Sequence, residues 1–89
     1  MMVKFVKTYV DVLVKMRRDG TILPQKVLWE DKAYEIDCIM KISPIPNYKK
    51  IPGSDTMKYI CEIQGKRKEL FLEDYPRRWY VEKPVLQFV

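Results

Sequence analysis

Alternation of apolar and polar residues with a period of two is the feature that most limits how this chain can fold. It is clearest in segment 34–42, where one face is apolar and the other is mostly charged. The apolar face would carry Tyr34, Ile36, Cys38, Met40 and Ile42. Successive side chains of a strand point to opposite sides of a sheet, so this spacing predicts a half-buried strand. Ile39 is the only apolar residue on the polar side.

The same period recurs along the chain and predicts about six short strands. The first would place Val10, Val12, Val14 and Met16 on one face. A helix is the alternative there, because Val6, Val10 and Leu13 would also share a helical face, but the density of valine favours a strand. The other strands are predicted at 22–29, 57–64, 69–73 and 78–82. On the strand at 57–64, one face would carry Met57, Tyr59, Cys61 and Ile63.

Turn signals separate these segments. Asp19-Gly20 is a favoured hairpin turn, and the proline-rich segment 43–54 predicts the longest loop. We therefore expect one all-β domain spanning residues 1–89, a small antiparallel meander or partly open barrel of SH3-like kind. An OB-like barrel and a curved sheet sealed by dimerisation are the alternatives.

The composition agrees with a folded domain without a membrane segment. Apolar residues make up 47% of the 89 residues and charged residues 33%. No run approaches the roughly 18 consecutive apolar residues that span a bilayer. Lys4, Lys7 and Asp11 interrupt the segment where a signal sequence needs an apolar run. We expect a cytoplasmic protein.

The two cysteines and the absence of histidine limit the chemistry. Cys38 and Cys61 have no cysteine or histidine nearby in sequence, so a structural metal site is not supported. A disulfide between them is one interpretation. We prefer two reduced, buried thiols on neighbouring strands, because no export signal is present.

Catalysis is also poorly supported. Histidine, the commonest general base, is missing from the chain. The adjacent carboxylates at Glu30-Asp31 and Glu73-Asp74 lie on predicted turns, where they point apart. The three glycines are isolated turn residues and form no phosphate-binding loop. We expect a non-enzymatic binding module without a metal or cofactor.

The basic excess suggests a partner. Seventeen basic and 12 acidic residues give a net charge of +5. Pairs of adjacent basic residues fall at the first, third and fifth turns. Successive turns of an antiparallel meander alternate between the two ends of the sheet, so these three turns would lie at the same end. Aromatic residues accompany them, as in proteins that bind single-stranded nucleic acid. The predicted nucleic-acid site comprises Arg17, Arg18, Tyr48, Lys49, Lys50, Arg77, Arg78 and Trp79, with Tyr75 beside it.

Two alternatives weaken this interpretation. The basic pairs can simply be solvated, and Trp79 is a core candidate. In its favour, Glu30 and Asp31 at the opposite end would largely cancel the charges of segment 66–68, so the positive charge would lie on one side.

The apolar segment Val85–Val89 suggests a second role, protein association. It would either cover the mouth of the barrel or extend as an edge strand that pairs with another chain. The second arrangement predicts a homodimer.

Several segments resemble a family of small, uncharacterised bacterial β-rich proteins of similar length. The similar segments are Tyr9-Val10-Asp11-Val12, Asp19-Gly20, Trp29-Glu30-Asp31, Tyr34-Glu35-Ile36-Asp37, the later positions Tyr59, Cys61, Ile63, Gly65, Leu70, Phe71 and Glu73, and Arg78-Trp79-Tyr80-Val81-Glu82. The resemblance covers nearly the whole chain and implies a compact β domain. It implies no activity and transfers no functional residue. The loop at 44–54 departs from the family, because it is rich in lysine and proline here and rich in glycine in the relatives.

Overall fold

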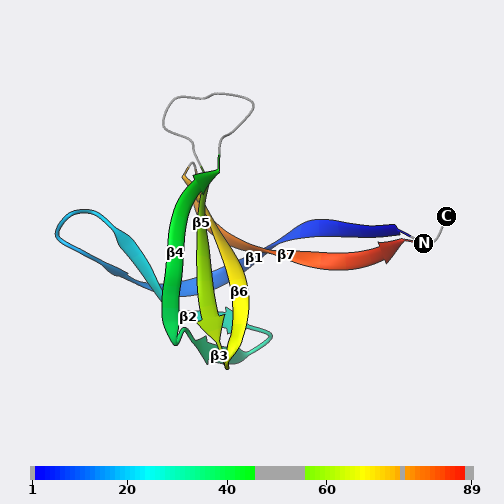
Figure 1. Ribbon diagram of the computed structural model, residues 1–89, viewed down its shortest axis with the longest axis horizontal. Helices are drawn as coiled ribbons and strands as arrows, with labels where there is room; N and C mark the ends of the chain where they lie inside the picture. Colours follow the sequence, from blue (N-terminus) through cyan, green and yellow to red (C-terminus); the bar gives the residue numbers. More distant parts are fainter. Residues whose placement is uncertain (1, 46–55, 75, 88–89) are drawn as a thin grey trace.

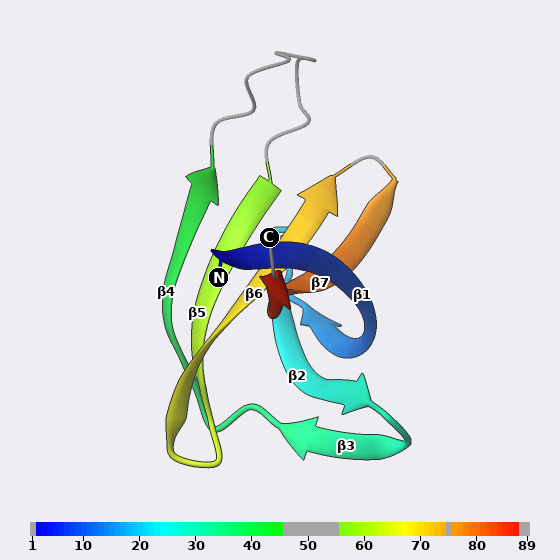
Figure 2. The ribbon, with the colours of Figure 1, turned by 90° about the vertical axis from the view of Figure 1, so that its right-hand side faces the viewer.

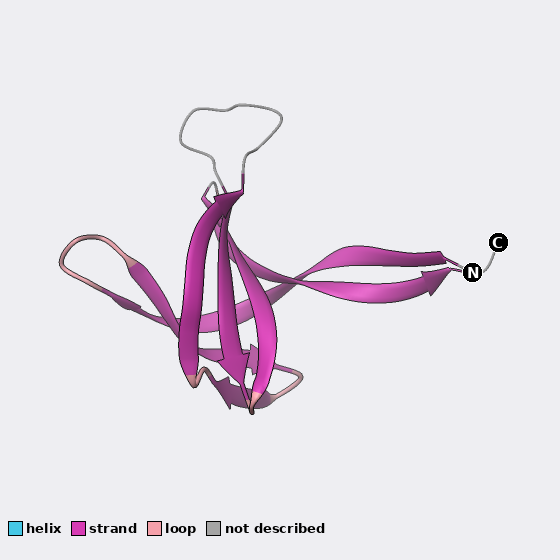
Figure 3. Ribbon diagram, viewed as in Figure 1, coloured by secondary structure: helices cyan, strands magenta, loops and turns pink. Residues whose placement is uncertain are grey.

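The computed structural model describes residues 2–45, 56–74 and 76–87, which form seven strands and no helix (Figures 1 and 3). The strands are β1 Met2–Met16, β2 Ile22–Trp29, β3 Lys32–Glu35, β4 Cys38–Ile45, β5 Thr56–Ile63, β6 Lys66–Asp74 and β7 Arg77–Gln87. The described residues thus offer no helix that could cross a membrane.

All seven strands belong to one antiparallel sheet in the order β3-β2-β1-β7-β6-β5-β4. The edge strands β3 and β4 are consecutive in the chain and are joined only by Ile36 and Asp37. A link of that length spans roughly 10 Å, so the two edges must approach each other and the sheet must curl. Figure 2 shows this curling. The prediction of an all-β, partly open barrel is confirmed, whereas its SH3-like kind stays a prediction.

The strands follow the up-and-down order of a meander that curls on itself: consecutive strands pair except β3 and β4, and β1 pairs with β7 from the far end of the chain. The β1–β7 pairing thus joins the segments β1–β3 and β4–β7 into one sheet.

The helix alternative for the first predicted segment is wrong, since residues 10–16 lie in β1. The predicted strand at 22–29 coincides with β2, whereas β6 and β7 extend beyond the predicted 69–73 and 78–82.

The predicted strand at 34–42 is interrupted, which raises the count from six to seven. The Ile36 amide donates to the Gln25 carbonyl at 3.0 Å, and the Asp37 amide donates to the Glu62 carbonyl at 2.8 Å. Within two residues, the backbone thus changes its hydrogen-bonding partner from β2 to β5.

A register shift between Ile39 and Lys41 then changes which side chains of β4 face inward. Ile39 and Ile42 pack against the core, whereas Cys38 and Met40 are exposed. The predicted apolar face is therefore wrong at Cys38 and Met40. An extra residue at a bulge reverses the alternation, and this explains why Ile39 seemed misplaced.

The core lies on the concave face of the sheet. Its buried members are Ile22, Val27, Tyr59, Cys61, Leu70, Leu72 and Trp79. The Tyr59 hydroxyl donates a 2.7 Å hydrogen bond to the Ile22 carbonyl and so ties β5 to β2 across the interior. The predicted inward face of segment 57–64 is confirmed, because Met57 and Ile63 pack against this core.

A smaller buried cluster lies on the outer face. Phe71 and Tyr80 stack with their ring centroids 4.9 Å apart, and Tyr9 meets Tyr80 edge to face at 6.0 Å. The Lys7 ammonium lies 4.9 Å from the centre of the Tyr80 ring and 3.3 Å from the Glu73 carboxylate. Segment 70–72 of β6 is therefore buried on both faces.

The segment after Pro84 does not cover the mouth of the barrel. Residues 85–87 continue β7 and pair along one edge with residues 2–4 of the same chain. Pairing with another chain, and the homodimer that it implies, stay a prediction. Figure 1 shows the resulting two-stranded ribbon extending away from the curled sheet. Phe88 and Val89 lie outside the described residues.

The two thiols have different surroundings. Both are free, and Cys61 is buried as predicted, but Cys38 is exposed, so the prediction of two buried thiols is half wrong. In the register Cys38 lies opposite Glu62, and Cys61 lies opposite Ile39. The cysteines occupy adjacent register positions whose side chains point to opposite faces. Burial raises the pKa of the Cys61 thiol to about 11.

This difference predicts the reactivity of the thiols at about pH 8, where the thiolate is the reacting form. A chromogenic disulfide reagent should modify one thiol per native chain rapidly, because Cys38 is exposed. The second thiol should react only after unfolding in denaturant. Cys38→Ser should abolish the rapid reaction. Two rapidly reacting thiols in the native protein would contradict the placement of Cys61.

Candidate nucleic-acid interface

The first turn has a well-defined hydrogen-bonding pattern. The Gly20 amide donates to the Arg17 carbonyl at 3.0 Å, and the Arg17 amide donates to the Thr21 carbonyl at 2.9 Å. The Thr21 amide donates to the Asp19 carboxylate at 2.9 Å, and this bond lowers the pKa of Asp19. Arg17 and Arg18 are exposed on this turn. Asp19 adds a carboxylate to the same turn, so the turn is not purely basic.

The first and fifth turns lie on the same groove, which agrees with their predicted placement at one end. Residues of both turns line one groove of about 480 Å³, namely Asp19, Gly20 and Thr21 from the first and Asp74 and Arg77 from the fifth. The third turn, with Tyr48, Lys49 and Lys50, lies outside the described residues, as does Tyr75. Of the predicted basic residues that the structure describes, only Arg77 lines this groove, so a common basic surface of the three turns stays a prediction.

The two arginines of the fifth turn diverge. Adjacent strand residues point to opposite faces, so Arg77 lines the groove, whereas Arg78 lies on the outer face. Arg77 pairs with Asp74 at 3.6 Å. Arg78 pairs with Glu73 at 3.4 Å and lies 4.2 Å from the centre of the Tyr9 ring. Both charges have nearby carboxylates, which weakens this end as a phosphate-binding surface.

Trp79 does not provide a stacking surface. It is only 9% exposed, and its ring lies 5.0 Å from that of Tyr59 in the core. The inclusion of Trp79 in the predicted site is therefore corrected, because its position on β7 directs it inward.

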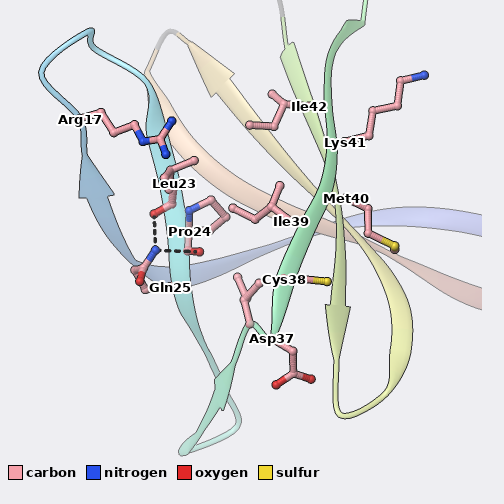
Figure 4. Close-up of a pocket in the computed structure, with 11 residues that line it drawn as sticks. Arg17, Leu23, Pro24, Gln25, Asp37, Cys38, Ile39, Met40, Lys41 and Ile42 are labelled. Atoms are coloured by element: carbon pink, nitrogen blue, oxygen red, sulfur yellow. Dashed lines mark hydrogen bonds between the residues drawn. The ribbon is translucent and has the colours of Figure 1, made fainter.

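Arg17 belongs to a separate groove of about 590 Å³ between β2 and β4 (Figure 4). Figure 4 shows Ile39 and Ile42 pointing from β4 toward β2, whereas Met40 and Lys41 point away. The Gln25 side chain donates weak, 3.5 Å hydrogen bonds to the carbonyls of Leu23 and Pro24. The exposed edge of β2 is thus partly capped, and this groove has no aromatic side chain in its lining.

A larger groove, of about 980 Å³, lies at the opposite end of the sheet. It forms where β6 and β7 separate. These strands pair only between segments 71–74 and 77–80. Beyond this point β6 continues beside β5, and β7 continues beside β1, so the sheet forks (Figures 1 and 2).

The floor of this groove is apolar and contains two aromatic rings. Trp29 follows Val27 by two residues on β2, and Tyr34 lies opposite Val27 in the register. Both rings therefore lie on the concave face, and both are partly exposed. The rest of the floor comes from Val27, Ile63, Leu70 and Val81.

The rim is basic. Lys66 and Lys68 lie opposite Ile63 and Cys61, and Lys83 follows Val81 by two residues, so all three share the concave face. The Lys83 ammonium lies 6.0 Å from the centre of the Trp29 ring. Within the described ranges, no carboxylate lies within 4.0 Å of these three ammonium groups.

We call this surface the lysine–aromatic groove and define it by Trp29, Tyr34, Lys66, Lys68 and Lys83. Arg67 and Glu69 also line the fork, but on its outer side, where they pair at 3.7 Å. Glu69 also pairs with Lys58 at 3.4 Å. The positive charge of the fork is therefore concentrated on the concave side.

The sequence interpretation missed this groove because it treated Lys66 and Lys68 as turn residues neutralised by Glu30 and Asp31. Neither acidic residue lines the groove. Both lie in the turn between β2 and β3, with positive φ angles of 47° and 65°. The sequence did indicate that these two lysines face inward. Lys66 and Lys68 are spaced by two residues from each other and from the inward-facing Leu70 and Leu72, so all four share one face of a strand.

The described residues contain no group of three or more histidine, cysteine, aspartate or glutamate side chains that could hold a metal ion. What the groove offers is aromatic faces beside ammonium groups that have no carboxylate partner in the described part of the chain. No family model, curated protein or solved structure matches the chain, so the resemblance to the bacterial β-rich family stays a prediction.

Proposed function

We propose that this protein is a non-enzymatic, cytoplasmic binding module that holds single-stranded nucleic acid in the lysine–aromatic groove. The observation that carries the proposal is the concave surface shared by Trp29, Tyr34 and three lysines without carboxylate partners within the described ranges. Unpaired bases stack on aromatic rings, and ammonium groups bind the phosphates between them.

The charge of the whole chain supports the same partner. A net charge of +5 attracts a polyanion at long range and speeds its association. Arg17 and Arg18 at the far end add to this attraction. They lack an exposed aromatic ring nearby among the described residues, so we assign them no base contact.

Replacing Trp29 by alanine should weaken binding of a fluorescently labelled oligothymidine roughly 5- to 150-fold, because one stacked base contributes about 1–3 kcal/mol. Fluorescence anisotropy at low salt measures this change. Trp29→Phe should retain most of the affinity, since the phenyl ring still offers a face.

Met16→Ala is the matched control, because Met16 is 62% exposed on β1 and does not line the groove. Circular dichroism would verify that each variant folds. Equal affinities of Trp29→Ala and Met16→Ala would reject the groove as the binding site, and absence of salt-sensitive binding by the unmodified protein would reject the function.

A further inference from the structure

The fork between β6 and β7 connects the two faces of the sheet. Its lining includes Lys83 on the concave face, and Phe5 and Pro84 on the other. Phe5 and Pro84 are opposite each other in the register and share a face with Lys7 and Glu82, whereas Lys83 shares a face with Val6. A ligand in the lysine–aromatic groove therefore has a route to the outer face past the free edge of β7.

Phe5 stands at the outer side of this route. It is 61% exposed, although it is a large aromatic side chain. Pairing with Pro84 fixes its backbone near the middle of the two-stranded ribbon that leaves the body of the protein. Among the described residues, Phe5 makes no ring contact like those that hold Tyr9, Phe71 and Tyr80. Its ring is therefore available to a ligand.

We infer that a bound single strand passes through the fork and stacks a base on Phe5 where it reaches the outer face. This inference rests on the proposed function and extends it by naming the ligand's path and a third stacking residue. Stacking on Phe5 requires an unpaired base, so the site selects single strands over duplexes.

The charges of the outer side give this contact a distinct signature. Glu69 is paired with Lys58 and Arg67, and Glu82 lies opposite Lys7. The outer side is therefore nearly neutral, in contrast to the three lysines of the concave side. Loss of Phe5 should lower the affinity without changing its dependence on salt, because no phosphate contact is removed.

The test compares Phe5→Ala with Val3→Ala in titrations of oligothymidines of about 12 and about 4 nucleotides, lengths that fall within the roughly 4–16 nucleotides that one OB fold binds. Val3 is the matched control, because it lies on the same face of β1, is 56% exposed and does not line the groove. Phe5→Ala should bind the longer strand roughly 5- to 150-fold more weakly, with an unchanged salt slope. The shorter strand, which fills only the concave groove, should bind both variants equally.

Two results would overturn the inference, and they are distinguishable. If Phe5→Ala and Val3→Ala bind the longer strand equally while Trp29→Ala binds it more weakly, the ligand stays in the groove and only the path through the fork is rejected. If Trp29→Ala also has no effect, the proposed function fails together with the inference.

Discussion

Replacing Leu70 by alanine should lower the free energy of unfolding by about 2–5 kcal/mol, the usual cost of a cavity left by a buried leucine. Leu70 is 1% exposed and lies opposite Tyr59 in the register of β5 and β6. It belongs both to the core and to the floor of the groove. A domain of this size is stable by only about 5–15 kcal/mol, so the loss is a large fraction of the total.

Urea denaturation followed by tryptophan fluorescence measures this loss. Leu13→Ala removes the same atoms from a side chain that is 53% exposed and should change the free energy of unfolding by less than about 0.5 kcal/mol. Equal effects of the two substitutions would mean that β6 does not form the centre of the core.

Local patterns predicted the elements that depend on local sequence. The strand at 22–29 was predicted from its position after the Asp19-Gly20 turn, and β5 was predicted from its alternation. Both sit in the interior of the sheet, where one face is buried along most of the strand. In such strands the period of two reports burial directly.

Features set by distant contacts were not predictable in this way. The break at residues 36–37 depends on partners at Gln25 and Glu62, and the pairing of β1 with β7 joins residues more than half the chain apart. The bulge at β4 reversed the phase of a strand that looked regular. An alternating pattern contains no information on where its register will shift.

The candidate site was only partly predictable, for the same reason. Basic and aromatic composition indicated nucleic acid, but the assignment to the first, third and fifth turns included Trp79, which belongs to the core. The lysine–aromatic groove combines residues from β2, β3, β6 and β7. It exists because the sheet forks, and a fork follows from strand pairing that the sequence does not state.

Replacing Lys66, Lys68 and Lys83 together by glutamine should have the largest effect on binding. Each phosphate contact with a single strand contributes about 0.7 to the slope of log affinity against log salt, so three contacts contribute about 2. The variant should bind oligothymidine weakly even at low salt, and its affinity should depend far less on salt. The fold should persist, because all three side chains are exposed.

Replacing Arg17, Arg18 and Arg77 together by glutamine is the matched control. It removes the same charge from the chain, but from the end that the sequence analysis favoured. Long-range attraction falls equally in both variants, so any difference between them reports direct contacts.

The salt dependence of oligothymidine binding, compared between these two triple variants and the unmodified protein, tests the placement of the site most directly. The lysine–aromatic groove predicts that the slope falls by about 2 in the lysine variant and stays near that of the unmodified protein in the arginine variant. A flattened slope in the arginine variant, with an unchanged slope in the lysine variant, would contradict this placement and assign binding to the opposite end of the sheet.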